Sequence, residues 1–184
     1  MNMFYSATCQ SPVGTLFIVV DGDGGLQNLS FSSKKAGIAS SVPATTECDH
    51  IKTGLAAYFS GKTAKFGINL RPRGTEFQKL IWKTLSSVPA GTTISYKELA
   101  ARAGKPQAIR ATANAVAANP IAIFIPCHRV LASDGTLGGY SAGKGDGGPK
   151  NRENLKIKSY LLDLEKQIEK SRKSDQKNKN VSSH

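Results

Sequence analysis

Short apolar runs separated by turn residues fill the first seventy positions of the chain. The runs cover residues 4–9, 16–20 and 26–31, and the segments between them, 11–14 and 21–25, contain Pro, Gly and Asp. Apolar runs of this length between turn signals are typical of strands. The pattern therefore predicts an antiparallel meander.

A helix is predicted to follow this meander. Apolar residues recur at helical spacing after a polar stretch, and the pattern stops at Gly61. The apolar positions are Ile51, Leu55, Tyr58 and Phe59. We expect this helix to cover the small sheet, and we expect the Pro- and Gly-containing segment 70–74 to separate this unit from the rest of the chain.

The pattern becomes mostly helical after residue 74. Thr75 and Gln78 have the spacing of a capping box, and the apolar face that follows them ends before Pro89. A second helix is predicted from Tyr96 to Ala103, with Ser95 as its N-cap. Both segments have the signals of helix starts at their N-terminal ends.

A third helix is predicted from Pro106 to Ala118, after a break at Gly104-Lys105. Two short helices around a turn that contains Gly predict a helix-turn-helix. In its plainest form the same pattern is a helical hairpin that packs on itself. The third helix carries one guanidinium, that of Arg110, among small side chains, and this side chain either extends into solvent or reaches a DNA groove.

These elements predict an α+β protein in three parts. Residues 1–71 form an N-terminal domain with a small antiparallel sheet and a covering helix. Residues 72–165 form a helical domain with the helix-turn-helix. The terminal run 166–184 holds six basic and two acidic residues, and its composition predicts disorder.

The charge balance favours a polyanionic partner. The chain has 25 Lys and Arg against 13 Asp and Glu, a formal net charge of +12, so nucleic acid is the leading partner and a solvated basic surface is the alternative. No apolar run is long enough for a membrane span and no signal peptide is evident, which favours an intracellular protein. Three cysteines at unrelated spacings predict free thiols.

One thiol stands beside an imidazole. The apolar run 121–125 leads into Pro126-Cys127-His128-Arg129-Val130. Thiolate is the nucleophilic form of cysteine, and a neighbouring base raises the thiolate fraction. An adjacent Cys and His can also be purely structural. No metal site is expected, because the Cys and His residues lack the paired spacing of zinc ligands.

The segment 126–130, preceded by Asn119-Pro120 and followed by Gly138-Gly139-Tyr140, closely resembles the active-site signature of the O6-alkylguanine-DNA alkyltransferases. Other stretches similar to the family are 11–14, 58–61, 74–78 with Trp82, and 95–100. The similarity covers roughly residues 4–165. A related group that binds such lesions without repairing them lacks the cysteine, and this chain has it.

The resemblance implies a fold and a way of binding DNA. It implies an N-terminal α/β domain and a C-terminal domain with a winged helix-turn-helix, whose second helix enters the minor groove. Arg110 has the family's finger position and would fill the space of an extruded nucleotide. Small residues would permit close approach to the DNA. The remaining DNA-binding residues expected are Ala108, Ala111, Ala113 and Ser95.

The resemblance also implies a reaction. An alkyl group would pass from O6 of guanine, or from O4-alkylthymine, to Cys127 in one irreversible turnover without a cofactor. His128 would withdraw the thiol proton through a water and would be oriented by Glu165, with Asp163 as the alternative carboxylate. Tyr96 would assist rotation of the base and donate a hydrogen bond to its ring nitrogen.

Other residues are implied as contacts of the leaving base. Ser141 would donate to O6, and the main-chain carbonyls of Cys127 and Val130 would accept from the exocyclic amine. Asn119 would tie together the turn before the active site. The further pocket residues expected are Tyr140 and Lys158.

One segment departs from the family pattern. The loop at 143–154 is rich in Gly and is about ten residues longer than expected, so it is either a tolerated surface insertion or a functional lid.

Two other classes of protein share parts of this pattern. One is a helix-turn-helix protein that binds DNA lesions without chemistry, and the other is a cysteine hydrolase that acts on an acyl carbon. The partner expected for the alkyltransferase is double-stranded DNA that contains O6-alkylguanine, with no membrane partner and a monomer in the absence of DNA. The expected location is the cytoplasm at the nucleoid, or the nucleus of a eukaryote.

Overall fold

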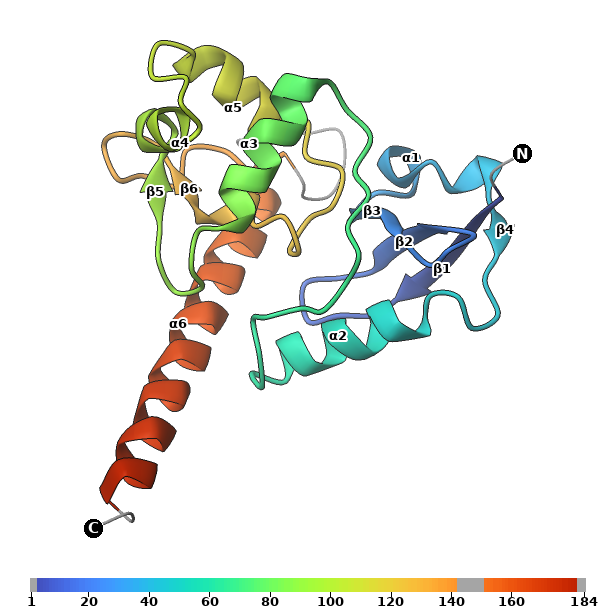
Figure 1. Cartoon of the computed structure of the whole chain (residues 1–184). Helices are drawn as coiled ribbons and strands as arrows, with labels where there is room; N and C mark the ends of the chain where they lie inside the picture. Colours follow the sequence, from blue (N-terminus) through green and yellow to red (C-terminus); the bar gives the residue numbers. More distant parts are fainter. Residues whose placement is uncertain (1–2, 142–150, 182–184) are drawn as a thin grey trace.

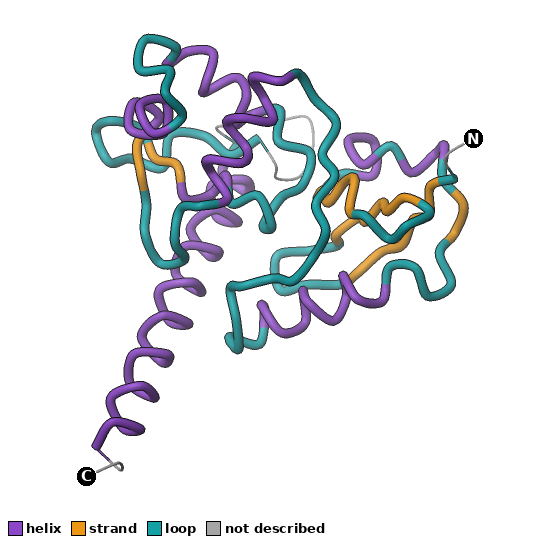
Figure 2. Tube along the Cα trace, in the orientation of Figure 1, coloured by secondary structure: helices purple, strands orange, loops and turns teal. Residues whose placement is uncertain are grey.

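The computed structural model describes residues 3–141 and 151–181. A small sheet with helices beside it forms the N-terminal part, and the later helices form most of the C-terminal part (Figure 1). The strands of the first part and the helices of the second are clearly separated in the trace (Figure 2). The protein therefore has the α+β architecture that the sequence predicts.

The N-terminal sheet has the strand order β3-β2-β1-β4. Its first three strands pair antiparallel, as the meander predicts. The fourth strand is short and pairs parallel to β1, so the expectation of a purely antiparallel sheet is wrong at this edge. The bounds are β1 Phe4–Cys9, β2 Leu16–Asp21, β3 Leu26–Ser30 and β4 Val42–Pro43.

The parallel edge follows from the connection that precedes it. Helix α1 (Ser33–Ala36) and the 3-10 helix η1 (Ile38–Ser40) carry the chain across the sheet, so β4 runs in the same direction as β1. The main-chain N–H of Ala44 then donates to the carbonyl of Ser6 at 2.8 Å. The polar stretch therefore adds a strand instead of ending as a loop.

Helix α2 (Asp49–Phe59) packs with the sheet and confirms the predicted helix. It buries the side chains of Ile51, Leu55 and Tyr58. Gly61 follows the helix with a φ of 76°, a conformation that glycine adopts without steric cost. The linker then runs beside β3, because the N–H of Leu26 donates to Asn69 and the N–H of Arg71 donates to Leu26, each at 2.8 Å.

The helical part begins with α3 (Glu76–Ser86). The capping box of Thr75 and Gln78 is present, with both reciprocal hydrogen bonds. Trp82 is buried, and its indole N–H donates to the carbonyl of Ala115 at 2.8 Å. This bond ties α3 to the helix-turn-helix.

The helix-turn-helix consists of α4 (Tyr96–Arg102) and α5 (Ile109–Ala117). Ser95 caps α4 as predicted. The sequence predicts that the second helix starts at Pro106, but 106–108 form a turn in which Ala108 N–H donates to the carbonyl of Lys105 at 2.9 Å. The short strands β5 (Ile94–Ser95) and β6 (Val130–Leu131) pair parallel below it.

Helix α6 (Arg152–Val181) corrects the prediction of a disordered tail. Leu161, Leu164 and Ile168 anchor its first half in the core. Its continuation is supported by ion pairs one turn apart, Lys166 with Asp163 at 3.6 Å and Arg172 with Glu169 at 3.4 Å. Figure 1 shows its C-terminal half extending away from the body of the protein.

The long loop at 143–154 can be followed only from residue 151, because 142–150 lie outside the described residues, as do 182–184 of the tail. Among the helices that the structure describes, none has the length and apolar character needed to cross a membrane.

Candidate active site

The site is built on the irregular segment between α5 and β6. Asn119 closes its first turn, because the side-chain amide donates to the carbonyl of Ile125 at 2.8 Å and the carboxamide oxygen accepts from Ile121 N–H at 3.0 Å. Asn119 thus occupies the bracing position expected for it. Ile123 has a φ of 71°, which is strained for a β-branched residue, so this turn is held in shape by the structure around it.

The N-terminal unit holds this turn from the other side. Leu29 of β3 donates its N–H to the carbonyl of Pro120 at 2.9 Å and accepts from Ala122 N–H at 2.8 Å. The rings of Phe66 and Phe124 pack edge to face at 4.4 Å between centroids. The active-site turn therefore depends on both parts of the chain.

Cys127 opens the 3-10 helix η2 (Cys127–Arg129) and is 5% exposed. A cavity of about 240 Å³ lies beside it, lined by Tyr96, Ala113, Val116, Ala117, Gly139, Tyr140 and Ser141. Burial raises the pKa of the Cys127 thiol, against the opposing effects of a hydrogen bond from Asn119 and the charge of Lys158. The resting group is therefore a thiol that needs a base before it can act as a nucleophile.

His128 and Glu165 form the expected pair. Nε2 of His128 lies 2.8 Å from Oε1 of Glu165, and both side chains are fully buried. Nδ1 of His128 has no hydrogen-bond partner within the described part of the chain. Burial lowers the pKa of His128, although Glu165 raises it in part, so the imidazole is neutral at pH 7 and can accept a proton.

Arg129 is a site residue that the sequence reasoning missed. Its Nε and Nη2 each donate to Glu165 at 2.7 Å, and its Nη1 donates to the carbonyl of Val88. Burial raises the pKa of Glu165, but the hydrogen bonds and charges of His128 and Arg129 outweigh it and lower this pKa to about 2. A buried carboxylate needs a compensating cation. Once Glu165 was expected to be buried, this requirement could have pointed to Arg129 as its partner.

Lys158 has a different place from the one expected. Its buried ammonium donates to the carbonyls of Val130 at 2.7 Å, Leu137 at 2.5 Å and Gly139 at 3.1 Å. Burial lowers the pKa of Lys158 to about 8. All three protons are used, so Lys158 braces the wall of the cavity and does not line it.

Three other predicted residues divide between the cavity and the surface. Tyr140 is buried, and burial keeps its pKa well above the ordinary value. Ser141 lines the cavity, and its main-chain carbonyl accepts from the ammonium of Lys35 at 2.5 Å. The alternative carboxylate, Asp163, is 61% exposed and pairs with Lys166, so it is not part of the site.

The residues expected to bind DNA lie on α5 or at the caps of α4 and α5. Arg110 and Ala111 are exposed, whereas Ala108 and Ala113 are half-buried. Ala113 also lines the cavity beside Cys127, so α5 forms one wall of the site. The hydroxyl of Ser95 accepts from the N–H of Glu98 at 3.1 Å, which is a capping contact.

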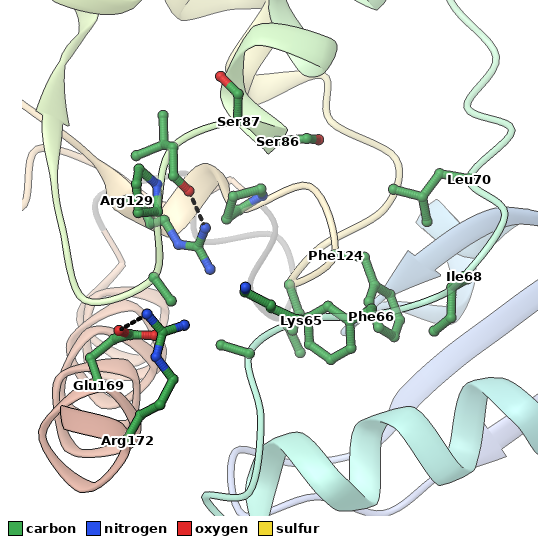
Figure 3. A pocket seen from close by; sticks show the side chains of 16 residues that line it. Lys65, Phe66, Ile68, Leu70, Ser86, Ser87, Phe124, Arg129, Glu169 and Arg172 are labelled. Atoms are coloured by element: carbon green, nitrogen blue, oxygen red, sulfur yellow. Dashed lines mark hydrogen bonds and ion pairs between the residues drawn. The ribbon is translucent and has the colours of Figure 1, made fainter. Parts of the chain in front are cut away.

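A second cavity, of about 550 Å³, lies where the linker, the end of α3 and α6 meet the active-site turn. Arg129 lies at its edge with its guanidinium directed towards Val88 (Figure 3). Cys127 does not line this cavity. The cavity borders the Glu165 network through Arg129 and does not border the thiol.

All three cysteines are free thiols, but their surroundings differ. Burial raises the pKa of Cys48 to about 11, and burial also raises the pKa of Cys9. Glu47 and Asp49 flank Cys48, but no buried histidine hydrogen-bonded to a carboxylate lies beside either thiol within the described residues. The part of the chain that the structure describes contains no group of His, Cys, Asp and Glu that could hold a metal ion.

Fold and site together define a class: an α+β protein in which a helix-turn-helix covers a buried thiol backed by a histidine and a carboxylate. Two family descriptions match the chain, the ribonuclease-like domain of 6-O-methylguanine DNA methyltransferase at residues 3–72 and the DNA binding domain of the same enzyme at residues 76–167.

The chain is similar to the methylated-DNA–protein-cysteine methyltransferase of Methanosarcina barkeri, with 42% identity over 172 residues, 89% of this chain and 97% of the relative. It is also similar to the solved O6-methylguanine methyltransferase of Mycobacterium tuberculosis, with 34% identity, a TM-score of 0.74 and coverage of 90% and 93%. A structure from the same organism in complex with DNA matches equally well. The chain belongs to the 6-O-methylguanine DNA methyltransferase family and is a methyltransferase of DNA repair.

Proposed function

We propose that Cys127 is the acceptor of the alkyl group, and that it is alkylated once and irreversibly by O6-alkylguanine in duplex DNA. The observation that carries the proposal is the position of Cys127. Its thiol lies against a cavity walled by α5, and the buried pair of His128 and Glu165 lies next to it in the fold. Cys9 and Cys48 have no such neighbours among the described residues.

The proposed chemistry uses the neutral imidazole of His128 as the base. Nδ1 accepts the thiol proton through a bridging water, since the described residues show no direct hydrogen bond between the two side chains. Glu165 stabilises the imidazolium that forms. The sulfur then bonds to the alkyl carbon while the bond between that carbon and O6 breaks, and its electron pair stays on guanine.

The departing guanine anion must be stabilised in the same cavity. Burial raises the pKa of Tyr96, so its hydroxyl stays protonated and can donate to a ring nitrogen of the base. The hydroxyl of Ser141 donates to O6. The carbonyl of Cys127 accepts from the exocyclic amine, and the carbonyl of Val130, which already accepts from Lys158, uses its second lone pair.

The base reaches the cavity by leaving the duplex. Cys127 is 5% exposed, so a base that is stacked in DNA cannot meet its sulfur. We assign the minor groove to α5, where Ala108, Ala111 and Ala113 allow close approach, and the space of the extruded nucleotide to Arg110. The same cavity accepts O4-alkylthymine. The Mycobacterium tuberculosis relative has been solved in complex with DNA, which supports DNA as the partner.

Cysteine variants test the proposal. Incubation of the protein with duplex DNA that carries O6-methylguanine should add one methyl group, found by peptide mass spectrometry on Cys127. Cys127→Ala should accept none and still bind the duplex, whereas Cys9→Ala and Cys48→Ala should be methylated like the wild type. Methylation of Cys127→Ala would refute the proposal. A wild type that binds the lesion but gains no mass would indicate the binding protein without chemistry.

A further inference from the structure

The N-terminal unit reaches the Glu165 network through one side chain, Tyr58 of α2. Its hydroxyl donates to Oε1 of Glu165 at 3.2 Å, and the side chain is fully buried. The two residues are 107 positions apart in the chain. A residue of the sheet-bearing unit therefore contacts the carboxylate that orients His128.

Tyr58 shares its acceptor with the histidine. Oε1 of Glu165 takes hydrogen bonds from Tyr58, from Nε2 of His128 and from Nη2 of Arg129. Oε2 takes the second bond from Arg129 and a longer one, 3.4 Å, from the N–H of Gly91. The direction and strength of the hydrogen bond between His128 and Glu165 thus depend on the hydrogen bonds that Tyr58 and Arg129 donate to the same oxygen.

The ring of Tyr58 is held in place by aromatic neighbours. It packs edge to face on Phe59 at 5.3 Å and lies 5.5 Å from Phe66. Phe66 in turn packs on Phe124 of the active-site turn at 4.4 Å. The hydroxyl therefore points at Glu165 from a fixed position, and the same aromatic group touches the segment that leads to Cys127.

We propose that Tyr58 is a positioning residue for alkyl transfer. Through it the N-terminal unit fixes the position of the Glu165 carboxylate and weakens the interaction of this carboxylate with His128. The inference rests on the proposed role of Cys127 and His128. It gives the N-terminal unit a part in the chemistry beyond support of the fold.

The effect on pH dependence follows from the charges around the network. His128 faces Glu165, Arg129 and Lys158, and Glu165 also faces Tyr58 and Tyr140. Without the hydrogen bond from the Tyr58 hydroxyl, the negative charge of Glu165 is less neutralised and stabilises the imidazolium form of His128 more strongly. The pKa of His128 then rises, and the acid limb of the rate profile moves to higher pH by about half a unit.

Tyr58→Phe tests the proposal because it removes the hydroxyl and keeps the ring. Single-turnover methyl transfer from O6-methylguanine duplex should show a maximal rate constant lower by about three- to tenfold, because the base is less well oriented. The DNA concentration at half-maximal rate should stay close to that of the wild type. The melting temperature should fall by a few degrees, because a hydrogen bond to a buried carboxylate is lost. Tyr5→Phe is the control, since Tyr5 lies on β1 and its hydroxyl bonds to no described residue.

Two results would overturn the inference. One is a Tyr58→Phe protein with the rate and pH profile of the wild type. The other is a loss of rate that tracks a lower melting temperature and leaves the acid limb in place, because that is the signature of a purely structural residue. Failure of the proposed function is visible separately, since the wild type would then leave Cys127 unmodified in the same assay.

Discussion

Glu165 keeps its negative charge inside the protein because one cation, Arg129, and several neutral donors bind it. Arg129 binds it through two nitrogens, and His128 and Tyr58 bind the oxygen that faces them. Burial and the charge of Arg129 lower the pKa of His128 although Glu165 raises it, so His128 is neutral at rest, and the ionised carboxylate stabilises the imidazolium when His128 takes a proton. The pairing with Arg129 is thus as much a part of the site as the thiol.

The low pKa of Glu165 makes stability depend on acid. Its pKa falls from 4.5 in the unfolded chain to about 2 in the folded protein, so its ionised form stabilises the fold above pH 4.5. That contribution should decline as the pH falls from 4.5 towards 2. Urea unfolding between pH 7 and pH 2 measures it. Glu165→Gln should be less stable at pH 7 by about 3–5 kcal/mol, because Arg129 stays buried without its partner, and its stability should change less with acid.

Asp163→Asn provides the matched control for this measurement. Asp163 lies on the same helix, but it is 61% exposed and pairs only with the exposed Lys166. Its replacement should change stability by less than about 1 kcal/mol at any pH in the range. An equal acid dependence of the wild type and Glu165→Gln would contradict the ionic network.

Arg110 should matter for duplex DNA and not for the chemistry. It is exposed on α5 and does not line the cavity of Cys127. Arg110→Ala should therefore slow methyl transfer from duplex DNA by about tenfold or more, because nothing then occupies the space of the extruded nucleotide. Reaction with a free O6-alkylguanine base should keep its rate. Equal slowing on both substrates would contradict this role.

At the scale of elements, the helix starts marked by side-chain caps were predictable, whereas the start expected at Pro106 was wrong and the edges that tertiary contacts define were not predicted. The capping box at Thr75 and the cap at Ser95 depend on neighbouring residues, and both lie where predicted. β4 needs the edge of β1 as a partner, and no local pattern announces it. The site shows the same division: Cys127, His128 and Arg129 stand in one motif, but the role of Arg129 follows from its contact with Glu165 on a distant helix.

Helix α6 shows why composition misled the prediction of the tail. Its polar sequence suggests disorder, yet Ile168 is buried and the turns after it continue a helix that is already anchored. Beyond that anchor the described side chains, 171–176, are all exposed. The end of the helix therefore adds charge to the protein and little to its core.

Truncation after Lys170 tests this division of α6. Removal of 171–184 should change the free energy of unfolding by less than about 0.5 kcal/mol, because the deleted side chains that are described lie on the surface. Figure 1 shows this end of α6 far from α4 and α5. The salt dependence of DNA binding should accordingly stay the same. The measured quantity is the slope of the logarithm of the binding constant against the logarithm of the salt concentration. If the tail binds DNA, the truncated protein will show a slope smaller by about 0.9 for each phosphate contact that is lost.

At the scale of the whole molecule, the two parts of the chain meet at the active site. β3 bonds to the turn at 120–122, Phe66 packs on Phe124, and Tyr58 bonds to Glu165. The helix-turn-helix covers the same cavity from the other side. A net charge of +12 favours binding to DNA, and in the proposed mechanism the cavity beside α5 receives the base.

The transfer that we propose has no return step, because a thioether on Cys127 offers water no group to displace. The most direct test of this central claim is a titration of the wild-type protein with increasing O6-methylguanine duplex, followed by counting of repaired guanines and of methylated Cys127 peptides. The account predicts that repair stops at one guanine per protein molecule and that each repaired guanine matches one methylated Cys127. Repair that continues beyond one equivalent, or repair with Cys127 unmodified, would contradict it.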